Sequence, residues 1–213
     1  MKYKLILFDF DFTLADCSSA IIECFNRSFH DMGLDTPDST EVRKTIGMTL
    51  PNAYTYLTGD NDETMRNACF TNFKKHADMI MTPMSEFIGS ADKTLARLHS
   101  EGYKLGIITT KLRYRITDFI EYKKLDNIFS IIFGIDSVEH PKPAPDGILK
   151  AASDLNIDKS EILYVGDNEI VGQAAKNAGV DFFAVLTGTT PKDILSQYTD
   201  KIADSVDDID LFL

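Results

Sequence analysis

The stretch KLILFDFDFTL, residues 4–14, determines how the rest of the chain is interpreted. Residues 4–8 form a short apolar run that fits a strand buried on both faces of a sheet, and the run ends abruptly at Asp9. Asp11 follows two positions later, so along an extended chain the two carboxylates point in the same direction. The stretch therefore predicts a buried strand that delivers two acidic side chains beyond its carboxyl end.

Two carboxylates in this arrangement need a positive partner. At ~4 Å two like charges repel by about 4 kcal/mol at an effective dielectric constant of 20, so packing alone does not favour the placement. A hard cation such as Mg²⁺, which prefers carboxylate oxygens together with water and phosphate, is the simplest partner. The alternative is a strand followed by an Asx-type turn, which is the commoner explanation of an isolated Asp-x-Asp. Residues further along the chain decide between the two.

The composition is that of a globular protein. The chain has 213 residues, 44% of them hydrophobic and 26% charged, and is long enough to bury a sizeable core. Its net charge of −11 argues against nucleic acid or an acidic membrane surface as a partner, because no basic stripe is available. No apolar window approaches the roughly 20 residues of a membrane span, so we expect a cytoplasmic protein. Cys17, Cys24 and Cys69 lack disulfide or metal-ligand spacing and are expected to be buried thiols.

Residues 16–83 are predicted to form a helical insertion. Apolar residues between Ile21 and Phe29 recur at helical spacing, and several glycines and prolines divide the segment into short helices. No convincing strand pattern occurs in it. We therefore expect a helical cap domain, a candidate lid, inserted into a core made of residues 1–15 and 84–213.

From about residue 90 the pattern alternates between helix and strand. After the first strand, four more apolar strands are expected, at residues 104–108, 128–133, 161–165 and 182–186. Helical patterns lie between them, and after Pro191 one more helix and an acidic tail are expected. Regular alternation of this kind predicts an α/β fold, a Rossmann-like parallel sheet with helices on both faces.

Polar side chains follow the strands of this predicted sheet. In an open parallel sheet, ligands bind beyond the carboxyl ends of the strands, near the point where the strand order reverses. The polar groups that the sequence brings to this edge are Asp9, Asp11, Thr109, Lys142 and Asp167. Each alone has a structural explanation as a helix cap, a solvated loop residue or a turn former. Their joint arrival at one edge predicts an active site.

These residue types fit phosphoryl transfer through an aspartyl-phosphate intermediate. Asp9, the first residue beyond the strand, would attack phosphorus, and Asp11 would protonate the leaving oxygen and then deprotonate the attacking water. Thr109 would donate a hydrogen bond to a phosphoryl oxygen, and Lys142 would offset the negative charge. Asp167, with Asp9 and the backbone carbonyl of Asp11, would hold Mg²⁺.

With these groups the chain resembles the haloacid dehalogenase superfamily, in its branch of phosphatases with a helical cap. The motifs that carry the resemblance are DFDFT at 9–13, ITTK at 108–111, KPAP at 142–145 and VGDN at 165–168. The spacing of all four together is highly specific, and the match covers essentially the whole chain. EVRKTIG at 41–47 adds a resemblance to phosphoglycolate-phosphatase-type enzymes.

The resemblance implies a Mg²⁺-dependent phosphatase whose cap closes over the site and selects the substrate. The substrate would be a small phosphorylated metabolite, phosphoglycolate-like or a sugar phosphate, and the enzyme a monomer or homodimer. The metal ligands would be Asp9, Asp11 and Asp167. The substrate-binding residues would be Thr110, Lys111, Arg43 and Gly47.

Two positions depart from the family pattern. Phe12 stands where the family often has Gly. Val171 stands where the fourth motif usually carries a second acidic residue, which supports the metal or the lysine. We expect a working metal site of modest affinity, with Glu169 as a possible replacement for the missing carboxylate.

Three alternatives remain open from the sequence. A phosphomutase of the beta-phosphoglucomutase type would share the five central groups but pass the phosphoryl group to a sugar hydroxyl instead of water. Dehalogenation is disfavoured, because that chemistry has no use for Asp11 as an acid or for a bound cation. A non-catalytic binding protein that keeps the fold is favoured only by Val171.

Overall fold

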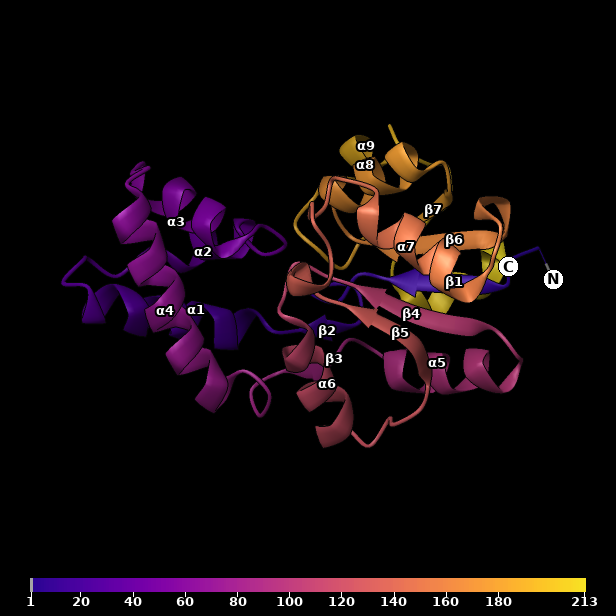
Figure 1. Ribbon diagram of the computed structural model, residues 1–213, viewed down its shortest axis with the longest axis horizontal. Helices are drawn as coiled ribbons and strands as arrows, with labels where there is room; N and C mark the ends of the chain where they lie inside the picture. The colour runs from indigo at the N-terminus through magenta and orange to yellow at the C-terminus, as the bar shows by residue number, and fades with distance from the viewer. Residues whose placement is uncertain (1) are drawn as a thin grey trace. The chain divides into compact units, whose positions relative to one another are not determined.

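A computed structural model describes residues 2–213 of the chain (Figure 1). The chain forms two compact units: Met1–Ala15 with Phe87–Leu213 make up the first, and Asp16–Glu86 make up the second. The second unit thus ends at Glu86, whereas the sequence pattern suggested residue 83. Within the described residues, no helix is both long enough and apolar enough to span a bilayer.

The first unit is built on a six-stranded sheet with the order β5-β4-β1-β6-β7-β8. Its strands are β1 (Leu5–Phe8), β4 (Lys104–Ile108), β5 (Phe129–Phe133), β6 (Ile162–Gly166), β7 (Asp181–Val185) and β8 (Ile202–Ala203). All neighbouring strands run parallel. This confirms the predicted α/β class with a Rossmann-like core.

Helices cover both faces of this sheet (Figure 1). They are α5 (Ala91–Ser100), α6 (Arg113–Tyr122), α7 (Asp146–Leu155), α8 (Glu169–Ala178) and α9 (Lys192–Leu195), with 3-10 helices η1 (Ile135–Ser137), η2 (Lys159–Glu161) and η3 (Val206–Phe212). Ile148 of α7 and Ala174 of α8 share one core with Leu7 of β1. On the opposite face, Phe183 of β7 packs on Phe212 of η3, with ring centroids 4.9 Å apart.

Strand β1 lies at the centre of the sheet, and the strand order reverses there. The chain adds β4 and β5 on one side of β1 and then β6, β7 and β8 on the other. Phe8, the last residue of β1, is in register with Ile107 of β4 and Val165 of β6. Asp9 therefore emerges at the switch point of an open parallel sheet, where ligands bind. All four residues of β1 are fully buried, which explains its uninterrupted apolar sequence.

The second unit is a bundle of four helices, as the sequence predicts for this segment. Its helices are α1 (Ser18–Asp31), α2 (Ser39–Lys44), α3 (Leu50–Thr58) and α4 (Glu63–Ile80). Phe25 of α1 packs edge-on against Phe73 of α4, with ring centroids 4.9 Å apart. The apolar and aromatic faces of this segment thus form its own core. Cys17, Cys24 and Cys69 are buried free thiols, which confirms the expectation for them.

Three short features were not predicted from the sequence. β2 (Ala15–Asp16) and β3 (Glu86–Phe87) form a two-stranded sheet where the chain passes between the units. β8 adds a sixth strand within the segment expected to hold only a helix and an acidic tail. That tail is not a free extension: Asp207 accepts hydrogen bonds from Ser90 N at 2.9 Å and Thr94 Oγ1 at 2.7 Å, and so caps α5.

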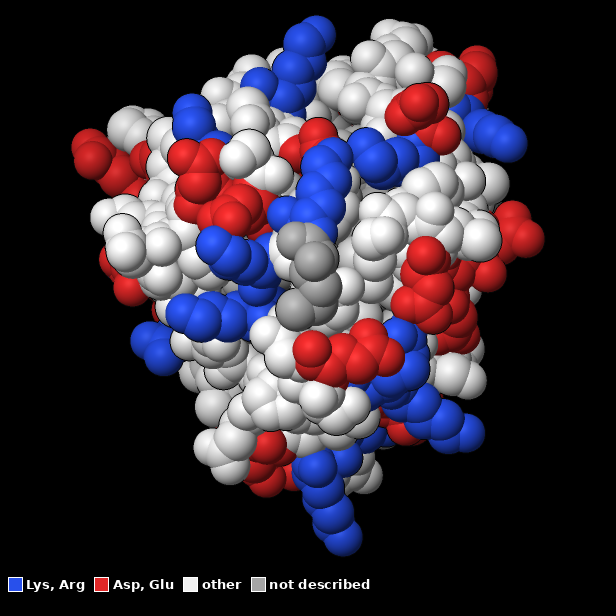
Figure 2. Space-filling model, turned by 90° about the vertical axis from the view of Figure 1, so that its right-hand side faces the viewer, with Lys and Arg blue, Asp and Glu red and all other residues white. Residues whose placement is uncertain are grey.

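Positive and negative side chains are interspersed over the face shown in Figure 2. At the amino ends of the strands, some of these charges form ion pairs. Lys2 Nζ lies 2.6 Å from Asp181 Oδ2, and Lys4 Nζ lies 2.6 Å from Glu161 Oε1. These two ion pairs lie at the end of the sheet opposite to the strand ends that carry the four sequence motifs.

Candidate active site

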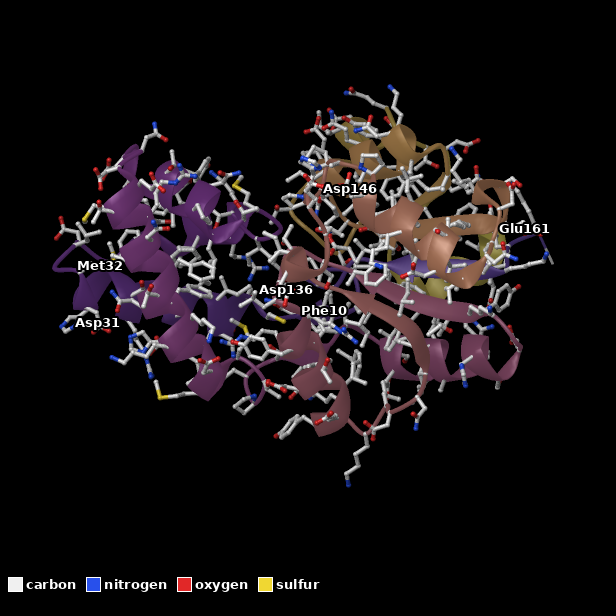
Figure 3. The ribbon with its side chains drawn as sticks, in the orientation of Figure 1. Phe10, Asp31, Met32, Asp136, Asp146 and Glu161 are labelled. Carbon is white, nitrogen blue, oxygen red and sulfur yellow. The ribbon has the colours of Figure 1, made fainter. Side chains whose placement is uncertain are left out.

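The candidate site lies at the carboxyl ends of the central strands. Figure 3 labels Phe10 and Asp136 at this end of the sheet and Glu161 at the other. Asp9 and Asp11 are both buried, at 2% and 5% exposure. The backbone N–H of Phe10 donates to Asp9 Oδ1 at 2.7 Å, which orients that carboxylate. The structure therefore brings both predicted carboxylates to the switch point.

The chain turns sharply after Asp11, and Phe12 carries this turn. Phe12 has a φ of 55°, in the left-handed region that a non-glycine residue rarely adopts. Its N–H donates to the carbonyl of Ala15 at 2.8 Å, and the carbonyl of Phe10 accepts from Leu14 N at 3.0 Å. This conformation explains why Gly is frequent at the position of Phe12 in the family: glycine takes a positive φ without steric cost.

Lys142 reaches the site from the loop before α7. Its Nζ lies 2.8 Å from Asp9 Oδ1, and both side chains are buried, at 4% and 3% exposure. The contact is an ion pair without good hydrogen-bond alignment, and within residues 2–213 the Lys142 ammonium has no aligned hydrogen-bond acceptor. An ammonium has three N–H donors, so Lys142 can contact Asp9 and an incoming oxyanion at the same time. Asn177 Nδ2 of α8 donates to the carbonyl of Pro143 at 2.9 Å and thereby holds the loop next to Lys142.

The loop after β4 brings Thr109 and Lys111 to the same edge. Thr109 is buried, and its Oγ1 accepts from Lys111 N at 3.2 Å. The Lys111 carbonyl accepts from Ile135 N at 2.9 Å, so η1 fixes this loop from the neighbouring strand. Lys111 Nζ lies 3.0 Å from Asp11 Oδ1. Thus each of the two predicted catalytic carboxylates is paired with a lysine.

Asp167 follows β6 and is 2% exposed. Its Oδ1 accepts from Asn168 Nδ2 at 3.1 Å and from Thr13 Oγ1 at 3.2 Å. The same Asn168 amide lies 3.5 Å from Asp9 Oδ2, so one side chain contacts both acids. Burial, and then the negative charge of Asp9, raise the pKa of Asp167 to about 8. Two buried carboxylates this close to one another form a site that favours a cation.

The donor set fits a hard divalent cation. Asp9 and Asp167 provide carboxylate oxygens, and the backbone carbonyl of Asp11 is the third ligand expected from the sequence. Across residues 2–213 no cluster of three or more His, Cys, Asp or Glu side chains is arranged to hold a metal. The ligand set expected from the sequence includes only two carboxylate side chains, those of Asp9 and Asp167, because Asp11 would contribute its backbone carbonyl. Such a set does not form a cluster of three acidic side chains. The metal assignment thus remains a prediction.

Val171 belongs to the core and not to the rim of the site. Its side chain is fully buried within the cluster beneath α8, and a Cβ placed on Gly166 would lie 2.5 Å from its Cγ1. The expected substitute, Glu169, faces elsewhere: its Oε1 accepts from the Tyr198 hydroxyl at 3.0 Å. The idea that Glu169 replaces the missing carboxylate is therefore not supported by the structure. The residue of this segment that contacts both Asp9 and Asp167 is Asn168, whose side chain is a neutral amide.

Tyr164 contacts the residues of the site from within the sheet, and it was not predicted from the sequence as a site residue. It is fully buried in β6, and its hydroxyl donates to the carbonyl of Ile108, the residue before Thr109, at 3.0 Å. Lys142 Nζ lies 6.0 Å from the centroid of its ring, on the ring face. Burial, followed by the charges of Asp9 and Asp167, raises the pKa of the Tyr164 hydroxyl, so it stays protonated as a donor.

We expect Tyr164→Phe to lower the free energy of unfolding by about 1–2 kcal/mol, because the buried Ile108 carbonyl loses its donor. The ring contact with Lys142 is retained, so kcat should fall by less than about tenfold, which is about 1.4 kcal/mol of transition-state energy. Urea denaturation and steady-state assays measure both. Tyr122→Phe is the matched control, since Tyr122 is 57% exposed. Equal stability of the two variants would contradict the role given to the hydroxyl.

Three of the predicted substrate-binding residues are placed as follows. Thr110 lies in the β4 loop between Thr109 and Lys111 and is half-buried. Arg43 and Gly47 belong to the second unit, where Arg43 Nη1 donates to Ser18 Oγ at 2.7 Å. Their assignment to a substrate site stays a prediction.

The fold and the four strand-end motifs define a class of protein. Residues 6–185 match the haloacid dehalogenase-like hydrolase family, and the chain belongs to this family. The resemblance found in the sequence is thereby confirmed, and with it the expectation of a hydrolase.

Individual relatives show which members of this family the chain resembles. The chain is 32% identical over 213 residues to pyrophosphatase PpaX of Bacillus mycoides, covering 98% of this chain and 96% of that one. A crystal structure of a haloacid dehalogenase-like hydrolase from Bacteroides fragilis superposes with a TM-score of 0.92 at 35% identity, covering 96% of this chain and 98% of that one. A predicted phosphoglycolate phosphatase from Haemophilus somnus shares the fold, with a TM-score of 0.90 at 23% identity and coverage of 98% and 97%. These names agree with the phosphatase-type enzyme expected from the sequence.

Proposed function

We propose that the protein is a Mg²⁺-dependent phosphatase that acts on a small phosphorylated metabolite through an aspartyl-phosphate. The observation that carries the proposal is the pairing of two buried acids with two lysines at the switch point: Asp9 with Lys142 at 2.8 Å, and Asp11 with Lys111 at 3.0 Å. A cation beside the nucleophile and a second cation beside the proton donor suit a substrate that brings in negative charge.

In the first half-reaction, a carboxylate oxygen of Asp9 bonds to phosphorus while the bond from phosphorus to the leaving oxygen breaks. Oδ1 is engaged by Lys142 and Phe10 N, whereas Oδ2 has a longer contact of 3.5 Å with Asn168, so Oδ2 is the oxygen better placed to attack. Asp11 gives its proton to the leaving oxygen. Lys142 and the Thr109 hydroxyl stabilise the charge on the phosphoryl oxygens.

In the second half-reaction, water attacks phosphorus and gives its proton to Asp11, and the bond between phosphorus and Asp9 breaks to release phosphate. Asp9, Asp167 and the main-chain carbonyl of Asp11 would hold Mg²⁺. When bound, that ion would neutralise the phosphate and the acids around it. Thr13 and Asn168 keep Asp167 oriented through their hydrogen bonds to its Oδ1.

The test is phosphate release from a panel of phosphorylated metabolites and one aryl phosphate, measured with Mg²⁺ and with a chelator. Mg²⁺-dependent release supports the proposal. No release from any substrate, combined with transfer of phosphate between sugar hydroxyls, would point to a phosphomutase instead. No activity of either kind would favour a non-catalytic binding protein.

Lys111 makes a specific prediction about the leaving group. Because its ammonium lies beside Asp11, the proposed proton donor, it is close to the leaving oxygen. A leaving group with its own negative charge, such as phosphate or a carboxylate-bearing alcohol, would gain from this cation. The names of the relatives, pyrophosphatase and phosphoglycolate phosphatase, both describe substrates of this kind.

We expect Lys111→Met to lower kcat/KM for pyrophosphate or phosphoglycolate roughly 30-fold more than for a neutral alkyl phosphate, which corresponds to about 2 kcal/mol. Lys111→Arg should keep most of the preference because it keeps the charge. The ratio between the substrates is the measurement, since any general damage to Asp11 cancels in it. An unchanged ratio would show that Lys111 interacts with Asp11 but does not stabilise the charge of the leaving group.

A further inference from the structure

A fifth segment contacts the site, and none of the four motifs includes it. The loop between β7 and α9 begins after Val185, and the Thr187 hydroxyl donates a hydrogen bond to the backbone carbonyl of Phe12. This bond links the loop to the residue that lies between Asp11 and Thr13. Thr187 is half-buried, 175 positions along the chain from its partner.

The next residue of the loop, Gly188, lies against Asp167. A Cβ on Gly188 would be 1.9 Å from Asp167 Oδ2 and 2.7 Å from Asp167 Cγ. The φ of Gly188 is not in the left-handed region, so its backbone conformation does not require glycine. What requires glycine is space, because the Asp167 carboxylate occupies the position that a side chain at residue 188 would take.

Two adjacent residues therefore contact the two halves of the site. Thr187 binds the turn that carries Asp11 and Thr13, and Gly188 packs on Asp167, which Thr13 also contacts at 3.2 Å. We propose that Thr187 and Gly188 are positioning residues. They hold the turn after β1 and the Asp167 carboxylate in a fixed position relative to one another. The inference rests on the proposed function, because the relative position of the turn and Asp167 affects the rate only if Asp9, Asp11 and Asp167 take part in one reaction.

The turn at Phe12 is the element most in need of such support. A left-handed conformation costs a non-glycine residue about 1–2 kcal/mol, while one neutral hydrogen bond contributes about 1 kcal/mol. The hydrogen bond from Thr187 is thus comparable to the conformational preference that it opposes. If it is lost, the peptide after Phe12 can rotate, and a displacement of about 1 Å at a reacting group can lower the rate about 10²-fold.

The first test uses Thr187→Val, which removes the hydroxyl but keeps the side-chain shape. With an aryl phosphate we expect kcat to fall roughly 10- to 100-fold, as for a misplaced catalytic group. KM should change by less than about threefold, because ground-state binding is left in place. Thr187→Ser restores the donor and should recover most of kcat. Thr189→Val is the matched control, since Thr189 is exposed on the same loop.

The second test uses Gly188→Ala and a readout that does not depend on turnover. The added methyl must displace either the loop or the Asp167 carboxylate, so Mg²⁺ affinity measured by calorimetry should fall at least about tenfold, or 1.4 kcal/mol. Circular dichroism melting should show a folded protein. Thr189→Ala, at the neighbouring position, should bind Mg²⁺ like the unaltered protein.

The outcomes separate the two proposals. If the unaltered protein releases no phosphate from any substrate, the proposed function fails, and the Mg²⁺ titrations still test the positioning role. If the unaltered protein is active but Thr187→Val keeps its full kcat, or Thr187→Ser is as impaired as Thr187→Val, the positioning role of Thr187 is wrong. Unchanged Mg²⁺ affinity in a folded Gly188→Ala variant would exclude the role of Gly188.

Discussion

Asp9→Asn is expected to reduce phosphate release by roughly 10⁴-fold or more, the scale on which removal of a covalent nucleophile acts. Asn cannot form the acyl-phosphate bond, and its Oδ1 can still accept from Phe10 N, as Asp9 Oδ1 does at 2.7 Å. Its Nδ2 is a donor and gives up the 3.5 Å contact that Asn168 Nδ2 makes with Asp9 Oδ2. The side-chain shape and the hydrogen bond from Phe10 N are therefore preserved while the nucleophile is lost. The measurement is single-turnover phosphate release at saturating substrate.

The same variant should remain folded. In the unaltered protein, Asp9 and Asp167 are both buried, Asp9 pairs with the Lys142 ammonium, and the charges of Asp9 and Lys142 both act on Asp167. Removing the charge of Asp9 ends the ion pair with Lys142 but also ends the repulsion that Asp9 exerts on the buried Asp167, so the two effects oppose each other. The thermal transition should accordingly shift little.

Asp154→Asn is the matched control for this experiment, since Asp154 forms a surface pair with Lys150 in α7 and is 44% exposed at its side chain. It should keep full activity. Activity of Asp9→Asn within about tenfold of the unaltered enzyme would contradict the assignment of the nucleophile, because a difference of 1.4 kcal/mol is too small for loss of covalent catalysis.

The main features of the fold were predictable because they follow from periodicity. The five strands β1, β4, β5, β6 and β7 are apolar and bounded by turn signals, and the sequence pattern located each within a residue or two. The parallel class followed from the alternation of these strands with helices. The same pattern located the strand ends and so brought Asp9, Thr109 and Asp167 to one edge. Strand β8 was missed because it has two residues at the edge of the sheet, too few to show a period.

The parts of the site that could not be predicted depend on tertiary contacts. Nothing local marks Thr187, whose partner is 175 positions away, or Tyr164, which reads as an ordinary buried residue of β6. For Asn168 a signal existed: it follows Asp167 at the start of α8, where its Oδ1 caps Val171 N at 3.1 Å. A residue in a capping position next to a predicted acid could have been proposed as a support for that acid.

Lys142→Met should be the most destabilising single change in the site. It leaves the buried Asp9 carboxylate without its ammonium partner, and breaking a buried pair in this way costs about 3–5 kcal/mol. Activity should be lost as well. Urea denaturation in the presence of a chelator measures the stability of the protein alone.

The double variant Asp9→Asn/Lys142→Met distinguishes a charge effect from a packing effect. If the loss in Lys142→Met comes from the unpaired Asp9 carboxylate, neutralising Asp9 should restore at least about 2 kcal/mol, since contacting charges are strongly non-additive. If the loss comes from the space around the Lys142 stem and the Tyr164 ring, the two changes should add. Restoration would show that the Asp9 carboxylate is destabilising when no cation lies beside it, which is the condition that makes a cation at this edge favourable. Additive losses would place Lys142 in the site as a packing residue only, and would remove the charge pairing on which the proposed chemistry rests.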